Sequence, residues 1–219
     1  MVDTFNFIVN KYKLDIGRQY IVDIPNMGRN NLAELFAELN FKVGAEIGVA
    51  KGDYSEILCK ANPGLHLYSV DPWRRSAYDF SNDPKKSTIL LNQEGFDGEF
   101  EASKKKLAPY NCTLVRKMSM DALNDFEDNS LDFVYIDANH DFPNFINDLH
   151  NWLKKVKPGG IISGHDYCNF SYKKFTHIKR ALDAYARCYR MIPFFIIGSM
   201  EHHDGFIRDR YRSWMWVKE

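Results

Sequence analysis

The chain has 219 residues, and its 29 lysines and arginines balance 29 aspartates and glutamates, so the formal net charge at pH 7 is zero. A neutral chain has no net field that would draw it to nucleic acid or to an anionic membrane surface, which argues against both as partners. The length suits one sizeable α/β domain with a lid rather than two full domains, and the four scattered cysteines form no C-x-x-C pair that would indicate a zinc site.

Residues 1–40 are predicted to form an accessory helical segment. A short helix is expected at 5–12, and apolar residues at helical spacing predict a second helix over 32–39. Between them, 24–29 is predicted to be a loop because it is rich in turn-forming residues. Arg29 lies on this loop. It could contact a carboxylate or phosphate of a substrate, although a solvated surface arginine is the simpler explanation.

The stretch 43–52 is the most informative part of the chain. Its apolar start is typical of a buried parallel strand, and Gly48 and Gly52 then predict a turn before a helix. Such a unit brings backbone N–H groups to face a ligand, although a glycine after a strand is often only a turn. The spacing E-x-G-x-x-x-G differs from the G-x-G-x-x-G of dinucleotide binders. Glu46 at the strand end would repel a pyrophosphate but suits a cationic ligand such as S-adenosylmethionine.

The next helix is expected at about 53–62, where Asp53 and Glu56 resemble a capping box. A second strand, predicted at 66–71, ends in Asp71. An acid about 20 residues beyond a glycine turn is where a carboxylate grips the hydroxyls of a ribose. The alternative is that Asp71 is a turn residue before a proline.

The stretch 73–100 interrupts the alternation of strands and helices. It is interpreted as a lid over an acceptor pocket, because a loop of this length inside a compact domain is usually functional or disordered. A helix is predicted at 99–107 and a third strand at 112–117. Ser119 follows that strand, where it could border an adenine ring or simply cap a helix.

A fourth strand at 131–137 again ends in an acid, Asp137. The helix predicted after it, at 142–156, has the clearest apolar face in the chain, and its aromatic residues, Phe142 among them, are expected to be core. An acid at the end of a second neighbouring strand strengthens the prediction of a ligand site at the carboxyl edge of a parallel sheet.

A fifth strand at 161–164 delivers the sequence His-Asp-Tyr at 165–167. A helix is predicted at about 172–186, and strands at 194–198 and 213–217 should pair antiparallel because only a polar loop joins them. The elements together predict an α/β fold with a doubly wound, Rossmann-like, seven-stranded sheet, mostly parallel, with one antiparallel strand near the C-terminus.

Four motifs taken together resemble the class I S-adenosylmethionine-dependent methyltransferases: 46–52, Asp71, the sequence FVYIDANH at 133–140 and KPGGII at 157–162. The resemblance covers about residues 41–219. The pattern I-D-x-x-H, G-G and G-H-D-Y is similar to that of the macrocin and cephalosporin-tailoring O-methyltransferase group. This resemblance implies a cofactor domain at 41–219, with S-adenosylmethionine bound at the carboxyl edge of the sheet.

The resemblance also implies which residues would border the cofactor. They are Glu46, Gly48 and Gly52 on the methionine side, Asp71 at the ribose, Ser119 at the adenine, and Asp137.

Related enzymes often hold a divalent cation on acids that end the fourth and fifth strands, and these positions match Asp137 and Asp166. His165 stands where some relatives carry a second acid. Oxygen ligands favour magnesium, whereas an imidazole favours manganese, iron or zinc. The expected cation is therefore Mg or Mn.

Three residues are the catalytic candidates, namely Asp137, His140 and His165. A hydroxyl acceptor must lose a proton when it is methylated, and a histidine titrates near neutral pH, so either histidine could be the general base. A cation could instead lower the acceptor's pKa. Each histidine could also simply hold a strand-to-helix turn by a hydrogen bond.

The sequence thus favours a methyltransferase that modifies a hydroxyl of a small molecule, a sugar or a natural product by analogy. A nicotinamide-dependent oxidoreductase and a non-catalytic cofactor-binding protein are the alternatives. We expect a cytoplasmic location, since the chain shows no leader and no apolar run of ~18 residues. A homo-oligomer is compatible with this reading, and residues 1–40 could pack on their own subunit or on a neighbour.

Overall fold

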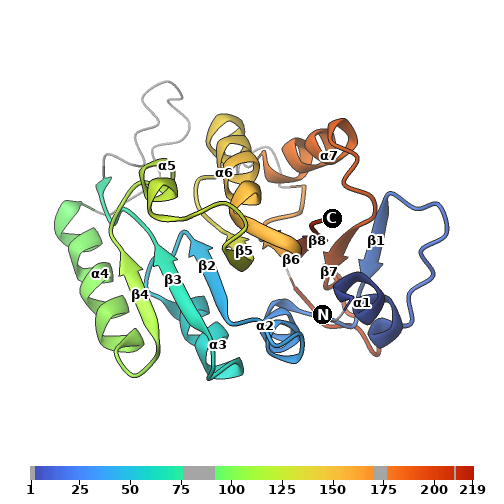
Figure 1. The fold of residues 1–219 in the computed structure, drawn as a ribbon, viewed down its shortest axis with the longest axis horizontal. Helices are drawn as coiled ribbons and strands as arrows, with labels where there is room; N and C mark the ends of the chain where they lie inside the picture. The colour runs from blue at the N-terminus through green and yellow to red at the C-terminus, as the bar shows by residue number, and fades with distance from the viewer. Residues whose placement is uncertain (1–2, 76–91, 170–176, 210) are drawn as a thin grey trace.

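The structure is a computed structural model, and it describes residues 3–75, 92–169, 177–209 and 211–219. Within these ranges, eight strands form one sheet in the order β1-β7-β8-β6-β5-β2-β3-β4 (Figure 1). Neighbouring strands are parallel except that β8 runs antiparallel to both β6 and β7. The strands are β1 (Ile21–Ile24), β2 (Val43–Ile47), β3 (His66–Val70), β4 (Cys112–Val115), β5 (Leu131–Ile136), β6 (Val156–Gly164), β7 (Phe194–Ile197) and β8 (Ser213–Val217).

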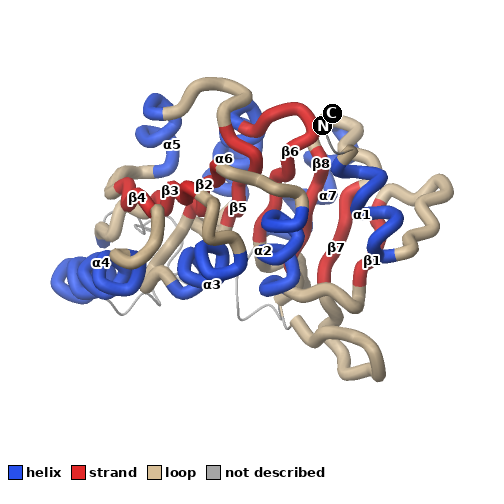
Figure 2. Tube along the Cα trace, turned by 60° about the horizontal axis from the view of Figure 1, so that its bottom comes forward, coloured by secondary structure: helices blue, strands red, loops and turns tan. Residues whose placement is uncertain are grey.

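Helices cover both faces of the sheet, with α5, α6 and α7 on one side and α1, α2 and α3 on the other (Figures 1 and 2). Consecutive residues of β5 point to opposite faces, so Val134 is buried with Leu149 of α6, and Tyr135 with Leu35 and Leu58 of α2 and α3. None of the helices in the described residues is long and apolar enough to cross a membrane. The helices are α1 (Thr4–Tyr12), α2 (Arg29–Glu38), α3 (Asp53–Ala61), α4 (Gln93–Leu107), α5 (Ser119–Ala122), α6 (Phe142–Lys155) and α7 (Ile178–Cys188).

The predicted layered α/β fold with a mostly parallel sheet is confirmed, but the predicted count of seven strands is wrong. The eighth strand, β1, lies in the N-terminal segment, which we expected to be helical with loops. Its four residues include a charged one, Asp23, and Pro25 follows directly, so the local sequence carries little strand signal. These residues form a strand because they pair in parallel with β7, which is distant in sequence. The register begins with Ile21 opposite Phe194.

Three further expectations differ in detail. Helix α4 begins at Gln93, inside the stretch 73–100 predicted as a lid, and positions 76–91 of that stretch lie outside the described residues. The helix predicted from about 172 begins as α7 at Ile178, and positions 170–176 lie outside the described residues. Phe142 was expected in the core but is 49% exposed, because it is the first residue of α6, whereas Phe145 one turn later is buried.

Parallel neighbours place their carboxyl ends at the same edge of a sheet. Strands β3, β2, β5 and β6 are parallel neighbours in this order. The loop at 48–52, Asp71, Asp137 and Asp166, which follow these strands, therefore come to one edge, as the sequence predicts.

Candidate functional site

The loop after β2 has a tightly constrained backbone. Gly48 and Gly52 have φ angles of 92° and 73°, and Ala50 between them also has a positive φ of 48°. A Cβ added to Gly48 would lie 2.2 Å from the carbonyl oxygen of Asp137, so only glycine allows this loop to meet the end of β5. The glycine spacing thus has a structural reason at the point where the two strands end.

The capping box predicted for α3 is wrong. Gly52 is the N-cap residue, and it has no side chain with which to cap the helix. Asp53 instead pairs with Lys106 of α4, and Glu56 pairs with Lys60 one turn further along its own helix. Within the described part of the chain, the first turn of α3 therefore keeps backbone N–H groups without a side-chain cap.

Asp71 fixes the backbone of the glycine loop by hydrogen bonds. One of its carboxylate oxygens accepts hydrogen bonds from the backbone N–H groups of Val49 and Ala50, at 2.9 and 3.1 Å, and the other accepts from Trp73 at 2.8 Å. The side chain is buried, with 3% exposure for the residue. Asp71 therefore shapes the loop that faces the site, and its expected contact with a ribose stays a prediction.

Glu46 is buried on the strand before the loop and faces α3. Burial raises its pKa to about 8, although the hydrogen bond that it accepts from Ser55 and the charge of Arg29 oppose this rise. Ser55 Oγ also lies 2.8 Å from Ser69 Oγ on β3. This polar network fastens α3 to the two strands under the glycine loop. Its role beside a methionine group remains a prediction.

Ser119 does not cap a helix, since the N-cap of α5 is Met118 and makes no side-chain cap. The Ser119 hydroxyl donates to Asp148 and accepts a hydrogen bond of 2.7 Å from Trp152 Nε1, so it joins α5 to α6. A cavity of about 360 Å³ lies beside this point, past the ends of β3 and β4. It is lined by Pro72, Arg74, Gln93, Arg116, Lys117, Met118 and Asp121. The stretch 118–121, which the sequence places beside an adenine ring, contributes Met118 and Asp121 to this lining.

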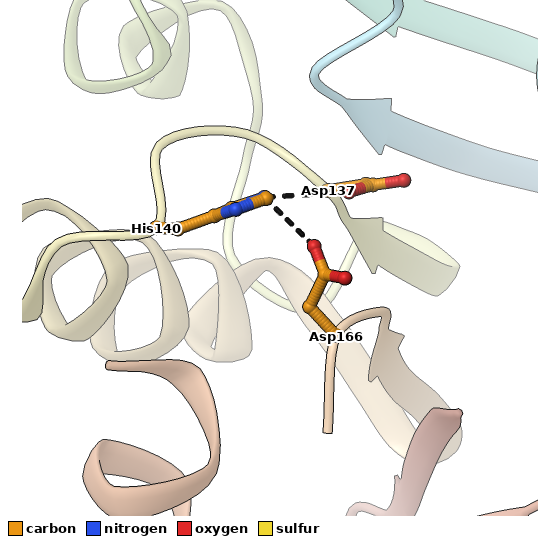
Figure 3. A group of neighbouring side chains, drawn as sticks. All are labelled: Asp137, His140 and Asp166. Carbon is orange, nitrogen blue, oxygen red and sulfur yellow. Dashed lines mark ion pairs between the residues drawn. The ribbon is translucent and has the colours of Figure 1, made fainter. Parts of the chain in front are cut away.

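Three predicted residues form a compact cluster at the ends of β5 and β6 (Figure 3). His140 Nε2 lies 3.0 Å from Asp166 Oδ2 and 3.6 Å from Asp137 Oδ1. One ligand atom from each residue lies within 4.8 Å of the others, a spacing that could hold a metal ion. The structure thus brings together the residues that the sequence singled out.

The charges of this cluster are strongly coupled. Burial works to raise the pKa of Asp137, but the contact with His140 and the charge of Arg29 outweigh it and lower that pKa. Burial works to lower the pKa of His140, and the two carboxylates, Asp137 and Asp166, outweigh it and raise it. For Asp166 burial prevails, and its pKa is raised. The two carboxylates therefore stabilise the protonated form of His140 against the effect of burial.

His165 lies at the rim of the same cluster. Its Nδ1 is 3.6 Å from Asp166 and 3.9 Å from Asp137, and its Nε2 is 3.5 Å from Asp209. Asp209 belongs to the loop between β7 and β8. Sequence reasoning missed Asp209, because only the pairing of β7 with β8 carries this polar loop to the end of β6.

Arg29 also belongs to the site, and the simpler explanation of a solvated arginine is wrong. Its guanidinium lies 3.2 Å from Asp137 Oδ2 and 4.1 Å from the ring centroid of Tyr54. As the first residue of α2, it reaches this position because α2 packs against α3. The sequence flagged Arg29 as a substrate contact but carried no sign of the ion pair.

This edge of the sheet carries a strained glycine loop, an adjoining cavity and a carboxylate–histidine cluster, and residues 45–167 match the family model described as a methyltransferase domain. The match spans more than half of the 219 residues. The chain belongs to this methyltransferase family. The matched region of this methyltransferase runs from β2 to the end of β6, so it includes the glycine loop, Asp71, Asp137 and Asp166.

Solved O-methyltransferases share the fold of this methyltransferase. TomG of Streptomyces achromogenes, solved with S-adenosylmethionine, aligns with a TM-score of 0.55 and 15% identity, over 100% of this chain and 91% of its own. The O-methyltransferase of Bacillus cereus, solved with S-adenosylhomocysteine, gives 0.56 and 15%, over 100% and 92%. At these identities the likeness concerns the fold.

Two curated relatives have no assigned function. Protein R132 of Acanthamoeba polyphaga mimivirus is 24% identical over 80% of this chain and 75% of its own length. Protein y4gI of Sinorhizobium fredii is 36% identical over 53 residues, which are 24% of this chain and 6% of that protein. The matched part of the chain therefore spans a small fraction of y4gI.

Proposed function

We propose that this methyltransferase uses S-adenosylmethionine to methylate a hydroxyl group of a small molecule, a sugar or another polyhydroxylated natural product. The observation that carries the proposal is that the family match at 45–167 contains both the glycine loop and the acidic cluster at one edge of the sheet. The S-adenosylmethionine and S-adenosylhomocysteine in the two solved O-methyltransferases of the same fold support this cofactor.

The cofactor would lie across the ends of β2, β3 and β4. Its adenosine would occupy the cavity beside Pro72 and Met118, and its methionine group would face the glycine loop, with the sulfonium near Asp137. Backbone N–H groups at the start of α3 suit the carboxylate of that methionine. The carboxylate of Asp71, which fixes the loop, would then set the distance between the two halves of the cofactor.

Methyl transfer needs little beyond alignment of nucleophile, methyl group and sulfur, but the acceptor hydroxyl must lose its proton. His165 is the base that we propose for this proton. Its Nε2 faces Asp209, and its Nδ1 faces the cluster. His140 is the alternative base. It is more exposed, but it is engaged with Asp137 and Asp166.

The donor set of the cluster fits a divalent cation. Asp137, His140 and Asp166 offer two carboxylates and an imidazole, a mixed set that favours manganese or iron over magnesium. When bound, such a cation supplies Lewis acidity that favours the ionised form of an acceptor hydroxyl. The same residues would keep that hydroxyl beside the sulfonium.

Within the family, we assign this chain to the macrocin and cephalosporin-tailoring branch, on the strength of its I-D-x-x-H and G-H-D-Y patterns. A nicotinamide-dependent oxidoreductase is not favoured, because the matched family is a methyltransferase one and the glycine spacing differs from that of dinucleotide binders.

Calorimetric titration of S-adenosylhomocysteine into the purified protein tests the proposal. We expect micromolar binding that Asp71→Asn weakens by at least about tenfold, since the loop loses the carboxylate that orders it. Asp128→Asn is the control, because Asp128 is an exposed acid that precedes β5 and lies outside the glycine loop and α3, and it should leave the affinity unchanged. Absence of binding by the folded, unsubstituted protein would contradict the proposal.

A further inference from the structure

Arg29 enters the site from outside the region that matches the methyltransferase family. Its guanidinium lies over the ring of Tyr54 and 5.2 Å from the ring centroid of Tyr135. The hydroxyl of Tyr54 donates a hydrogen bond of 3.0 Å to the backbone carbonyl of Arg29. Both ends of the residue are therefore held by the same aromatic side chain.

The pairing fixes the orientation of one carboxylate. Arg29 lies 3.2 Å from Oδ2 of Asp137, and His140 lies 3.6 Å from Oδ1. A carboxylate with a different cation at each oxygen has little freedom to rotate about its χ2 bond. Asp137 therefore presents a defined face to the space between the glycine loop and the acidic cluster.

Stability alone does not explain a guanidinium at this position. Its Nε atom is buried and has no hydrogen-bond partner among the described residues. Leaving a buried donor unpaired is unfavourable, and an apolar side chain of similar volume would pack on the two tyrosines without that cost. What the guanidinium provides here, and an apolar side chain would not, is the ion pair with Asp137.

We propose that Arg29 is a positioning residue of the methyltransferase, which holds the Asp137 carboxylate in the orientation that receives the cationic part of the cofactor. The proposal rests on the proposed function. It makes the N-terminal segment, residues 1–40, a part of the site, since Arg29 is carried by α2.

A double-mutant cycle on the affinity for S-adenosylmethionine, whose sulfonium carries the charge that S-adenosylhomocysteine lacks, tests the proposal. Arg29→Met and Asp137→Asn, each alone, should weaken binding by about tenfold or more. In the Asp137→Asn background, Arg29→Met should cost little further affinity, because the carboxylate on which it acts is gone. Arg29→Lys should give an intermediate affinity, since it keeps the charge but loses the planar stacking on Tyr54.

The control variant is Lys11→Met, which removes an ion pair with Glu38 inside the same N-terminal segment and should leave the affinity unchanged. Urea unfolding of each variant checks that the site is folded when binding is measured. Costs that add fully in the double variant would overturn the proposal, because Arg29 would then contact the ligand by itself. If the folded, unsubstituted protein does not bind the cofactor at all, the proposed function is refuted, and this inference with it.

Discussion

The buried acid Asp148 makes the stability of the fold depend on pH, and its surroundings decide the sign of this dependence. Asp148 lies on α6 with 4% exposure, and its carboxylate accepts a hydrogen bond from Ser119 at the start of α5. Burial raises its pKa from 3.8 to about 7, against the effect of the Ser119 hydrogen bond. The folded protein therefore binds a proton on Asp148 that the unfolded chain releases between these two values.

The sign and size of the effect follow from this difference. The pKa of Asp148 is higher in the folded protein than in the unfolded chain, so its protonation stabilises the fold. This stability is fully present below the unfolded pKa of 3.8 and is lost as the pH rises through the folded pKa of about 7. Each unit of pKa difference corresponds to about 1.4 kcal/mol, so the full contribution is about 4 kcal/mol. Between pH 8 and pH 5 the protonation of Asp148 should add about 3 kcal/mol to the free energy of unfolding.

Asp148→Asn removes the titration and keeps an oxygen for Ser119 to donate to. The assay is urea unfolding of both proteins at pH 5 and pH 8. We expect the variant to gain about 3 kcal/mol relative to the unsubstituted protein when the pH rises from 5 to 8. Asp204→Asn, at an exposed position, should show no such change. An equal difference at both pH values, or one of opposite sign, would refute the reasoning.

Two further predictions concern the glycine loop and the acidic cluster. Gly48→Ala should lower the free energy of unfolding by at least about 2 kcal/mol, because its φ is 92° and its Cβ would meet the backbone of Asp137. The control is Gly98→Ala in α4, where a Cβ meets nothing within 4 Å, and it should raise the free energy of unfolding by up to about 1 kcal/mol. Similar small effects at both sites would contradict the loop geometry. After dialysis against a chelator, calorimetric titration with Mn²⁺ should show binding that Asp166→Asn weakens by at least about tenfold, and an unchanged affinity in the variant would exclude Asp166 as a ligand.

Much of the central sheet could be predicted because its strands carry their own signal. Residues 131–136 are almost wholly buried on both faces, so their apolar run indicates a central parallel strand without any knowledge of its neighbours. The cluster at Asp137 and Asp166 follows from the same logic. Each acid ends a strand, and parallel strands end at one edge.

The features that were missed depend on contacts between distant parts of the chain. Strand β1 is a strand only because β7 lies beside it. Asp209 reaches the site through the loop between β7 and β8, and it carries no local motif. Arg29 was named from the sequence, but its ion pair with Asp137 depends on the packing of α2. The prediction of a capping box at Asp53 was wrong for another reason. The carboxylate of Asp53 pairs with Lys106 of α4, and the N-cap position is occupied by Gly52.

A crystal structure of the protein with S-adenosylhomocysteine tests most directly whether this edge of the sheet is a methyltransferase site. We predict that the adenosine lies in the cavity beside Pro72 and Met118, that the amino-acid part follows the loop at 48–52, and that the sulfur points toward Asp137. Electron density for the ligand at any other place, with this edge of the sheet unoccupied, would contradict that assignment.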